Sequence, residues 1–108
     1  TNRPTRFSHI LLRHLRIGRF FDTVLCGDAI RRIKPHPQIL RMIMRRLKAR
    51  PSQTLFAGDM TIDVQTGKRA GVFTVAVVTG SSSRRQLAAE KPDRILPAIR
   101  QLRRLLSA

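Results

Sequence analysis

The chain has 108 residues, with 22 Lys and Arg against 6 Asp and Glu, so its formal net charge at pH 7 is +16. This length fits one small domain, and the 42% hydrophobic content is enough for a core. No apolar run reaches the roughly 18 residues of a membrane span, so we expect no membrane segment. A single cysteine, Cys26, excludes an internal disulfide. Because the first residues also lack the apolar stretch of a secretory signal, we expect a cytoplasmic protein.

In the first half of the chain, apolar spacing predicts two helices separated by a short strand. Residues 5–16 carry apolar side chains at helical spacing, and Gly18 ends the pattern. Residues 23–26 form a β-prone run. Residues 37–48 carry a second helical pattern, and Pro51 lies just past its end.

The second half predicts a parallel sheet. Residues 54–57 and 73–78 are continuous apolar runs, as expected for strands that are covered on both faces. Residues 62–70 between them form the crossover helix. Further along, we expect a loop at 79–85, a short edge strand at 94–95 and a terminal helix at 96–106. This order predicts a single α/β domain over residues 1–108.

Two carboxylates stand where the strand at 54–57 runs into the crossover helix. Asp59 and Asp63 are four residues apart and are two of only six acidic residues in the chain. Carboxylates this close repel each other unless a cation or a hydrogen-bond network holds them, and carboxylate oxygens are the hard ligands that Mg²⁺ prefers. The alternative is that Asp59 caps the helix that begins near Met60, with Asp63 favoured by the positive helix end. The spacing alone leaves both interpretations open.

Polar residues near two other helix starts have both a functional and an ordinary interpretation. Lys34 stands before a Pro-rich helix start, where helix N–H groups and an ammonium can jointly hold phosphate. It can equally be a solvated lysine in a basic chain. Thr1, Asn2 and Pro4 suit a helix cap followed by proline in the first turn. The histidines have no Cys or His partner at metal-binding spacing, so we expect structural roles for them.

The positive charge suggests contact with polyanions. Arginines recur between apolar positions on several predicted helices, which is typical of solvated helix faces. There are five Phe and no Tyr or Trp to stack on bases. We therefore expect nonspecific, salt-sensitive binding to nucleic acid at low salt rather than a dedicated nucleic-acid reader.

Four segments occur in the order of one known family. These are TNRP at Thr1, FFDTVLCGD, IKPHPQIL with Lys34, and LFAGDMTIDVQTGKRAGV with Asp59 and Asp63. The last resembles a strand that ends in G-D-x-x-x-D before a helix and A-G-V. Together they resemble the haloacid dehalogenase-like (HAD) phosphatases, in particular the phosphoglycolate phosphatase-like branch. The likeness covers nearly the whole chain and fades after about Arg84.

The resemblance implies an α/β fold, a three-layer Rossmann-like core around a parallel sheet, and Mg²⁺-dependent hydrolysis of a small phosphate monoester. It implies that Asp59 is a catalytic metal ligand and that Asp63 assists through metal-bound water or by orienting its neighbours. Thr1 and Asn2 would bind phosphate oxygens. Lys34 would neutralise the phosphate and shield the nucleophile.

The family's nucleophile motif, an Asp-x-Asp loop, occurs nowhere in this sequence. The helical cap that follows that motif is missing too. The resemblance therefore implies the C-terminal half of such an enzyme, whose sheet lacks its central strand. We expect no turnover by this chain alone, and a marginal or oligomeric fold unless a complementing N-terminal segment completes the sheet.

Three functions remain open: part of a phosphatase, a non-catalytic half-domain that binds a phosphorylated ligand or a partner chain, and a basic nucleic-acid-binding module.

Overall fold

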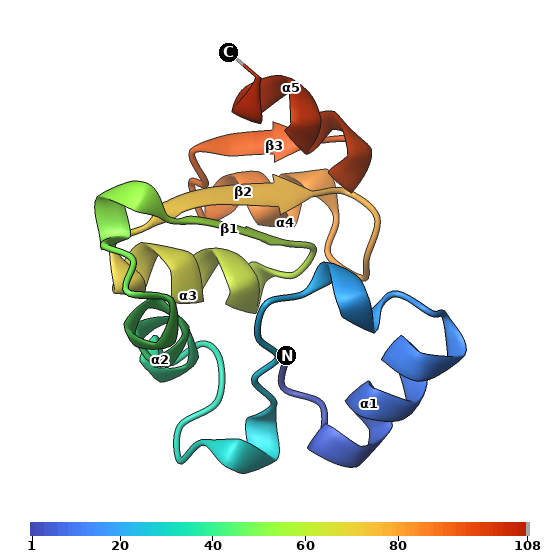
Figure 1. Ribbon diagram of the computed structural model, residues 1–108. Helices are drawn as coiled ribbons and strands as arrows, with labels where there is room; N and C mark the ends of the chain where they lie inside the picture. The colour runs from blue at the N-terminus through green and yellow to red at the C-terminus, as the bar shows by residue number, and fades with distance from the viewer. Residues whose placement is uncertain (108) are drawn as a thin grey trace.

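The sheet has three parallel strands, which appear together in the computed structural model of residues 1–107 (Figure 1). β1 (Leu55–Gly58) pairs with β2 (Phe73–Val77), and β2 pairs with β3 (Arg94–Leu96). In this register Ala57 lies beside Val75. The predicted strands at 54–57 and 73–78, and the predicted edge strand at 94–95, are therefore confirmed with small shifts in their ends.

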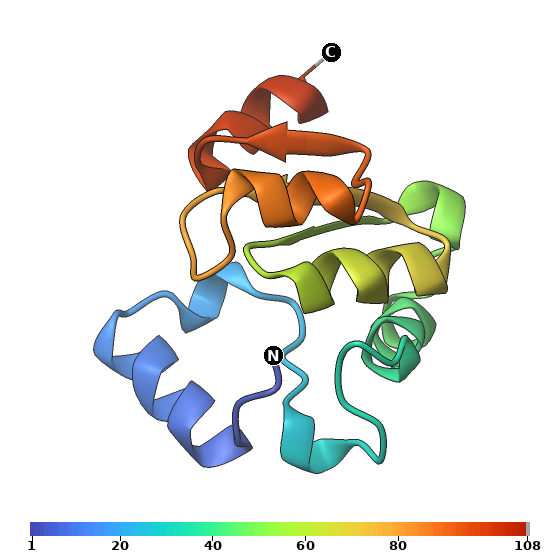
Figure 2. The same cartoon turned by 180° about the vertical axis from the view of Figure 1, so that it is seen from behind.

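The crossover helices cover one face of this sheet. α3 (Thr61–Ala70) connects β1 to β2, and α4 (Arg84–Ala89) connects β2 to β3; Figure 2 shows both in front of the strands. Val64, Ala76 and Leu87 form a fully buried cluster between these helices and β2. Burial of each such side chain stabilises the fold by about 1–3 kcal/mol.

α2 (Gln38–Leu47) lies beside α3 and builds a second cluster (Figure 1). Its buried members are Leu25, Ile39, Leu40, Met44 and Val72. α2 thus joins the N-terminal part of the chain to the sheet, and it does so through apolar residues at helical spacing.

The predicted strand at 23–26 is wrong. These residues have no regular structure and lie away from the sheet, next to residues 1–3. The backbone nitrogen of Thr1 donates to Leu25 O at 3.1 Å, and Gly27 N donates to Arg3 O at 3.1 Å. A strand needs a continuous ladder with a neighbour, and the three residues beside this segment provide only two bonds. The β-prone side chains are buried instead, as for Leu25 and Cys26.

The rest of the N-terminal part is helical and exposes apolar side chains. α1 (Thr5–His14) is followed by short 3₁₀ turns η1 (Gly18–Phe20) and η2 (Gly27–Ala29). The large apolar side chains left exposed in this part are Phe7, Ile10, Leu11, Leu15, Phe20 and Phe21.

Two further differences lie in the C-terminal third. The predicted loop at 79–85 ends earlier, because Ser83 caps α4. Ser83 Oγ accepts from Gln86 N, and Gln86 Oε1 accepts from Ser83 N, which is the reciprocal pattern of a capping box. The predicted helix at 96–106 is shorter: Leu96 belongs to β3, and the helix forms as η4 (Ile99–Gln101) and α5 (Leu102–Leu106).

The fold class is α/β with a three-stranded parallel sheet, as predicted. The three-layer arrangement is only partly present in residues 1–107: α3 and α4 cover one face, and no helix crosses β1 on the side that faces the viewer in Figure 1. β1 is an edge strand of the described sheet. Within the same residues, none of the helices has the length and apolar character needed to cross a membrane.

Candidate functional site

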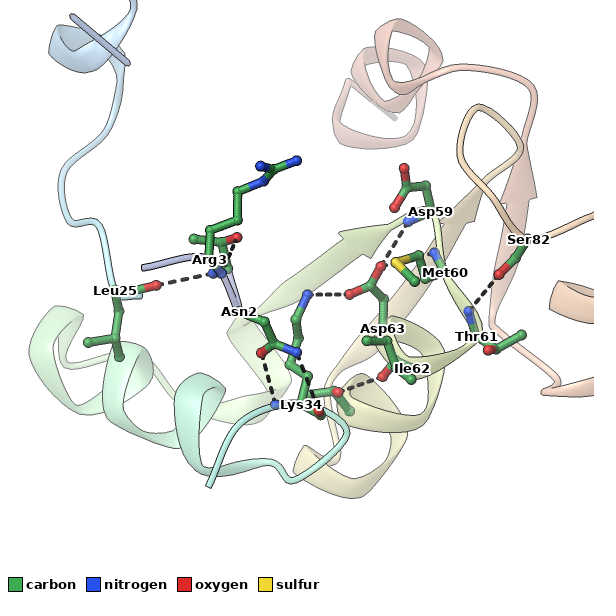
Figure 3. A network of polar contacts seen from close by, with 12 residues as sticks. Asn2, Arg3, Leu25, Lys34, Asp59, Met60, Thr61, Ile62, Asp63 and Ser82 are labelled. Carbon is green, nitrogen blue, oxygen red and sulfur yellow. Dashed lines mark hydrogen bonds and ion pairs between the residues drawn. The ribbon is translucent and has the colours of Figure 1, made fainter. Parts of the chain in front are cut away.

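The site forms at the carboxyl end of β1, where the chain turns into α3. Asp63 lies in the first turn of α3 and is buried, with 4% of its surface exposed. Its Oδ2 accepts hydrogen bonds from Asp59 N and Met60 N, both at 3.0 Å (Figure 3). A carboxylate at a helix N-terminus is also favoured by the helix dipole. Asp63 therefore fixes the turn that carries Asp59.

Lys34 reaches the same carboxylate from another part of the chain. Its Nζ lies 2.5 Å from Asp63 Oδ1, and the two side chains are 14% and 6% exposed. This is the one ion pair within residues 1–107. A pair with so little solvent exposure is strongly destabilised when either partner is removed alone, because the other charge stays buried.

Asn2 holds the backbone of Lys34. Lys34 N donates to Asn2 Oδ1 at 3.1 Å, and Asn2 Nδ2 donates to Lys34 O at 3.4 Å. Both ends of the Asn2 amide are thus used by one residue. This clamp brings the N-terminal segment and the Lys34 loop together beside Asp63 (Figure 3).

Thr1 flanks this group of residues. Its Oγ1 accepts a hydrogen bond from Arg3 N at 3.2 Å. Burial lowers the pKa of the Thr1 amino group, and the positive charge of Lys34 lowers it further.

The Asp59 carboxylate points away from Asp63 and accepts no hydrogen bond from any residue in the described part of the chain (Figure 3). It packs against the loop that follows β2. A Cβ added at Gly80 would lie within 3 Å of the Asp59 carboxylate, so only glycine allows this approach. In the same loop, Ser82 Oγ accepts from Thr61 N at 3.1 Å. The ends of β1 and β2 therefore meet around Asp59.

The five predicted site residues are brought together, and the structure divides their roles. Asp59 is half-buried and available to a ligand. Asp63, Lys34 and Asn2 are engaged with one another or with the backbone. The capping alternative is wrong for Asp59, since Met60 is the N-cap residue and has no side-chain bond. For Asp63 the predicted preference for the helix start is confirmed.

Within residues 1–107, no three His, Cys, Asp or Glu side chains cluster closely enough to hold a metal ion by themselves. Mg²⁺ commonly takes one or two protein carboxylates and completes its shell with water and substrate phosphate. The available Asp59 carboxylate fits this role as one ligand. Asp63 is bound to the backbone of the turn, so it fits the role of holding the Asp59 turn in place.

The sequence interpretation gave no role to Ser82 or Gly80, and it placed Gly58 in the G-D-x-x-x-D segment without a role of its own. A Cβ at Gly58 would meet the Asp63 side chain within 3 Å, so this glycine allows Asp63 to fold back over the turn. The signal available for Gly80 and Ser82 was their position just after a predicted strand, where ligand-binding loops lie in parallel sheets.

Comparison with protein families matches residues 1–77 to the family described as Haloacid dehalogenase-like hydrolase. Among curated proteins, phosphoglycolate phosphatase from Pseudomonas syringae pv. syringae (strain B728a) is 40% identical over 102 residues, which are 94% of this chain and 38% of that protein. The phosphoglycolate phosphatase of Salmonella typhimurium (strain LT2) is 37% identical over 102 residues, 94% of this chain and 40% of its own length.

Solved structures agree with this placement. A predicted phosphoglycolate phosphatase from Haemophilus somnus 129PT superimposes with a TM-score of 0.92 at 28% identity, over 98% of this chain and 47% of that one. A putative haloacid dehalogenase-like hydrolase from Bacteroides fragilis gives a TM-score of 0.89 at 30% identity, over 94% of this chain and 49% of that one. The chain thus spans about two fifths of these curated relatives and about half of these solved chains.

Proposed function

Because this chain belongs to the haloacid dehalogenase-like hydrolase family, we propose that it is the C-terminal part of a Mg²⁺-dependent phosphate-monoester hydrolase. The observation that carries the proposal is the convergence of Lys34, Asn2 and Asp63 beside an Asp59 carboxylate that has no protein partner. An ammonium next to an available carboxylate at a strand end suits a phosphate held together with a divalent cation.

Each residue has a distinct task in this proposal. Asp59 would hold Mg²⁺, which when bound offsets charge on the transferring phosphoryl group. Lys34 neutralises phosphate oxygens. Asp63 keeps the Lys34 ammonium and the Asp59 turn in place, and its own ligand role is through water at most. Thr1 and Asn2 would lie beside the phosphate bound by Lys34. Asn2 acts mainly by fixing the Lys34 backbone.

The sequence holds no Asp-x-Asp pair, so this chain contributes no nucleophile to the reaction. The attacking carboxylate would come from an N-terminal segment of the same fold, and the chain alone would have no turnover. The substrate class is a small phosphate monoester. The names of the curated relatives make phosphoglycolate the first substrate to test.

Two features support a complementing N-terminal segment as the partner. The outer edge of β1 has no strand beside it within residues 1–107, and an open edge carries unpaired backbone groups. In addition, an apolar hollow of about 340 Å³ opens between α1 and the segment at 21–25. Its apolar lining is Leu11, Leu12, Phe21, Val24, Leu25 and Ile43. Without that segment, the same surfaces would favour association of two copies of this chain.

The test measures phosphate binding by the isolated chain with and without Mg²⁺. Binding is monitored through the NMR signals of Asp59, Met60 and Ser82. We expect phosphate to shift these signals only when Mg²⁺ is present, and Asp59→Asn to abolish the effect while the melting temperature stays unchanged. Shifts that are the same with and without Mg²⁺, or in Asp59→Asn, would contradict the assignment of the site.

The charge of +16 supports a second, weaker activity, which is nonspecific binding to nucleic acid. Its affinity should fall steeply between 50 and 200 mM salt, as expected for counterion release. It should not depend on Asp59, which separates it from phosphate binding at the site.

A further inference from the structure

Three arginines from three segments lie near His36. Arg32 and His36 belong to the loop before α2, Arg41 to α2 and Arg69 to the end of α3. Arg32 Nη1 lies 3.3 Å from His36 Nε2, and Arg69 Nη1 donates to Pro35 O at 3.2 Å. Arg41 lies in the first turn of α2, five residues after His36. Burial lowers the pKa of His36, and the nearby charges of Arg32, Arg41 and Arg69 lower it further.

No acidic side chain in the described part of the chain forms an ion pair with these arginines, since its one ion pair joins Lys34 and Asp63. Arg41 has no side-chain hydrogen bond there either. The three guanidinium groups near His36 therefore have no acidic partner in the described residues. These arginines are exposed, so solvent screens their mutual repulsion, and an anion bound between them would remove the rest of it.

The hydrogen bonds of His36 show the same excess of donors. Gln38 N donates to His36 Nδ1 at 3.1 Å, so Nδ1 is the acceptor nitrogen of the neutral ring. A neutral imidazole has only one acceptor nitrogen, so Nε2 carries the proton. Nε2–H then faces the N–H groups of Arg32, and two donors point toward each other. An anion that accepts from both would satisfy them.

We propose that Arg32, His36, Arg41 and Arg69, here called the Arg32 cluster, form a binding site for a phosphate-bearing anion that is separate from the Asp59 site. The planar guanidinium fork matches two phosphate oxygens at once, and three forks suit a ligand with several phosphate oxygens. Lys34 lies in the same loop, but its ammonium is held by Asp63 and is not part of the cluster.

The cluster also has a backbone component. α2 has no acidic residue in its first turn, and of its first N–H groups Gln38 N donates to His36 Nδ1, so no carboxylate neutralises the positive end of the helix. Such a helix start favours phosphate, and it lies just after His36. This adds to the guanidinium groups but does not define the site without them.

The experiment is an NMR titration of the 108-residue chain with inorganic phosphate and with pyrophosphate, without Mg²⁺ and at constant ionic strength balanced with chloride. We expect saturable shifts of the His36 ring and of the Gln38 amide. Arg41→Gln alone should weaken binding several-fold without losing a protein contact. The triple variant Arg32→Gln, Arg41→Gln and Arg69→Gln should weaken it by about tenfold or more.

The matched control removes three equally exposed arginines elsewhere, by Arg13→Gln, Arg103→Gln and Arg104→Gln. It changes the net charge equally and should keep the affinity within about twofold, since the remaining effect is long-range and screened. An equal loss in both triple variants, or shifts that grow without saturation, would overturn the proposal. The absence of any saturable shift at His36 and Gln38 would overturn it too, while leaving the proposed function, whose test requires Mg²⁺, intact.

A further titration distinguishes free phosphate from the phosphate groups of a nucleic acid. A short single-stranded oligonucleotide is titrated under the same conditions and followed at the same signals. Binding of free phosphate or pyrophosphate at the His36 signals supports the proposed small-anion site. Binding of the oligonucleotide alone would contradict it and leave only the general affinity for polyanions.

Discussion

Separating the Lys34–Asp63 ion pair should destabilise the protein more than any other single change at the site. Asp63→Asn removes the negative charge from a side chain that is 6% exposed and that accepts three hydrogen bonds. It leaves the Lys34 ammonium, 14% exposed, without its partner. Loss of one partner of a buried pair costs about 3–5 kcal/mol, and we expect Asp63→Asn to fall in that range.

The reverse change, Lys34→Met, should cost less. The Asp63 carboxylate keeps its two bonds from Asp59 N and Met60 N and the favourable end of the α3 dipole. We expect a loss of about 1–3 kcal/mol. The double variant should be more stable than the sum of the two single losses predicts, by about 1–3 kcal/mol, because the two residues are in contact.

The assay is urea denaturation followed by circular dichroism, at one protein concentration for all four proteins, so that any association affects them equally. Single variants that each lose less than about 0.5 kcal/mol, together with an additive double variant, would refute the reasoning. That result would mean that water solvates both charges at this site and that Asp63 does not hold the turn.

Three other predictions follow from single contacts. Gly80→Ala should destabilise the fold by about 1–3 kcal/mol and reduce Mg²⁺-dependent phosphate binding by tenfold or more, because the added Cβ would lie within 3 Å of both the Cβ and the carboxylate of Asp59, so the turn as well as the carboxylate must shift; unchanged binding in the NMR titration would contradict it. The hydroxyl and then the amide of Thr5 lower the pKa of Asp28, so this carboxylate stabilises the start of α1 above its ordinary pKa and the stabilisation is lost as pH falls through the lowered value. The melting temperatures of the wild type and Asp28→Ala should therefore differ at pH 7 and converge toward about pH 2, and a difference that stays constant with pH would count against this. Gly71→Ala should cost about 1 kcal/mol in thermal or urea unfolding, because Gly71 ends α3 at φ 72° where a Cβ is strained; an equal or higher stability would show that the turn relaxes freely.

The unit from β1 to β2 could be predicted from the sequence because each of its signals is local. The continuous apolar runs, the start of α3 after Asp59 and the glycine at the end of α3 agree with one another. The segment at 23–26 could not be predicted in this way, since a strand depends on the partner beside it. α4 was predictable from the Ser83 and Gln86 capping pattern and was overlooked.

The candidate site residues could be located from the sequence, but their contacts could not. Motif order located Lys34, Asp59 and Asp63. That Asp63 is held by two backbone N–H groups and by Lys34, while Asp59 is left available, depends on how a loop distant in sequence approaches α3. The close packing of Gly80 on Asp59 depends in the same way on the meeting of two strand ends. Such contacts carry no local sequence signal.

The most direct test of the central claim supplies the proposed complementing segment. The part of the Pseudomonas syringae relative that this chain does not match is mixed with this chain, and phosphate release from phosphoglycolate is measured with and without Mg²⁺. Our account predicts no turnover by either part alone, Mg²⁺-dependent turnover by the mixture, and its loss by about a hundredfold or more with Asp59→Asn. Turnover by this chain alone, or a mixture that associates and yet is equally active with Asp59→Asn, would contradict it.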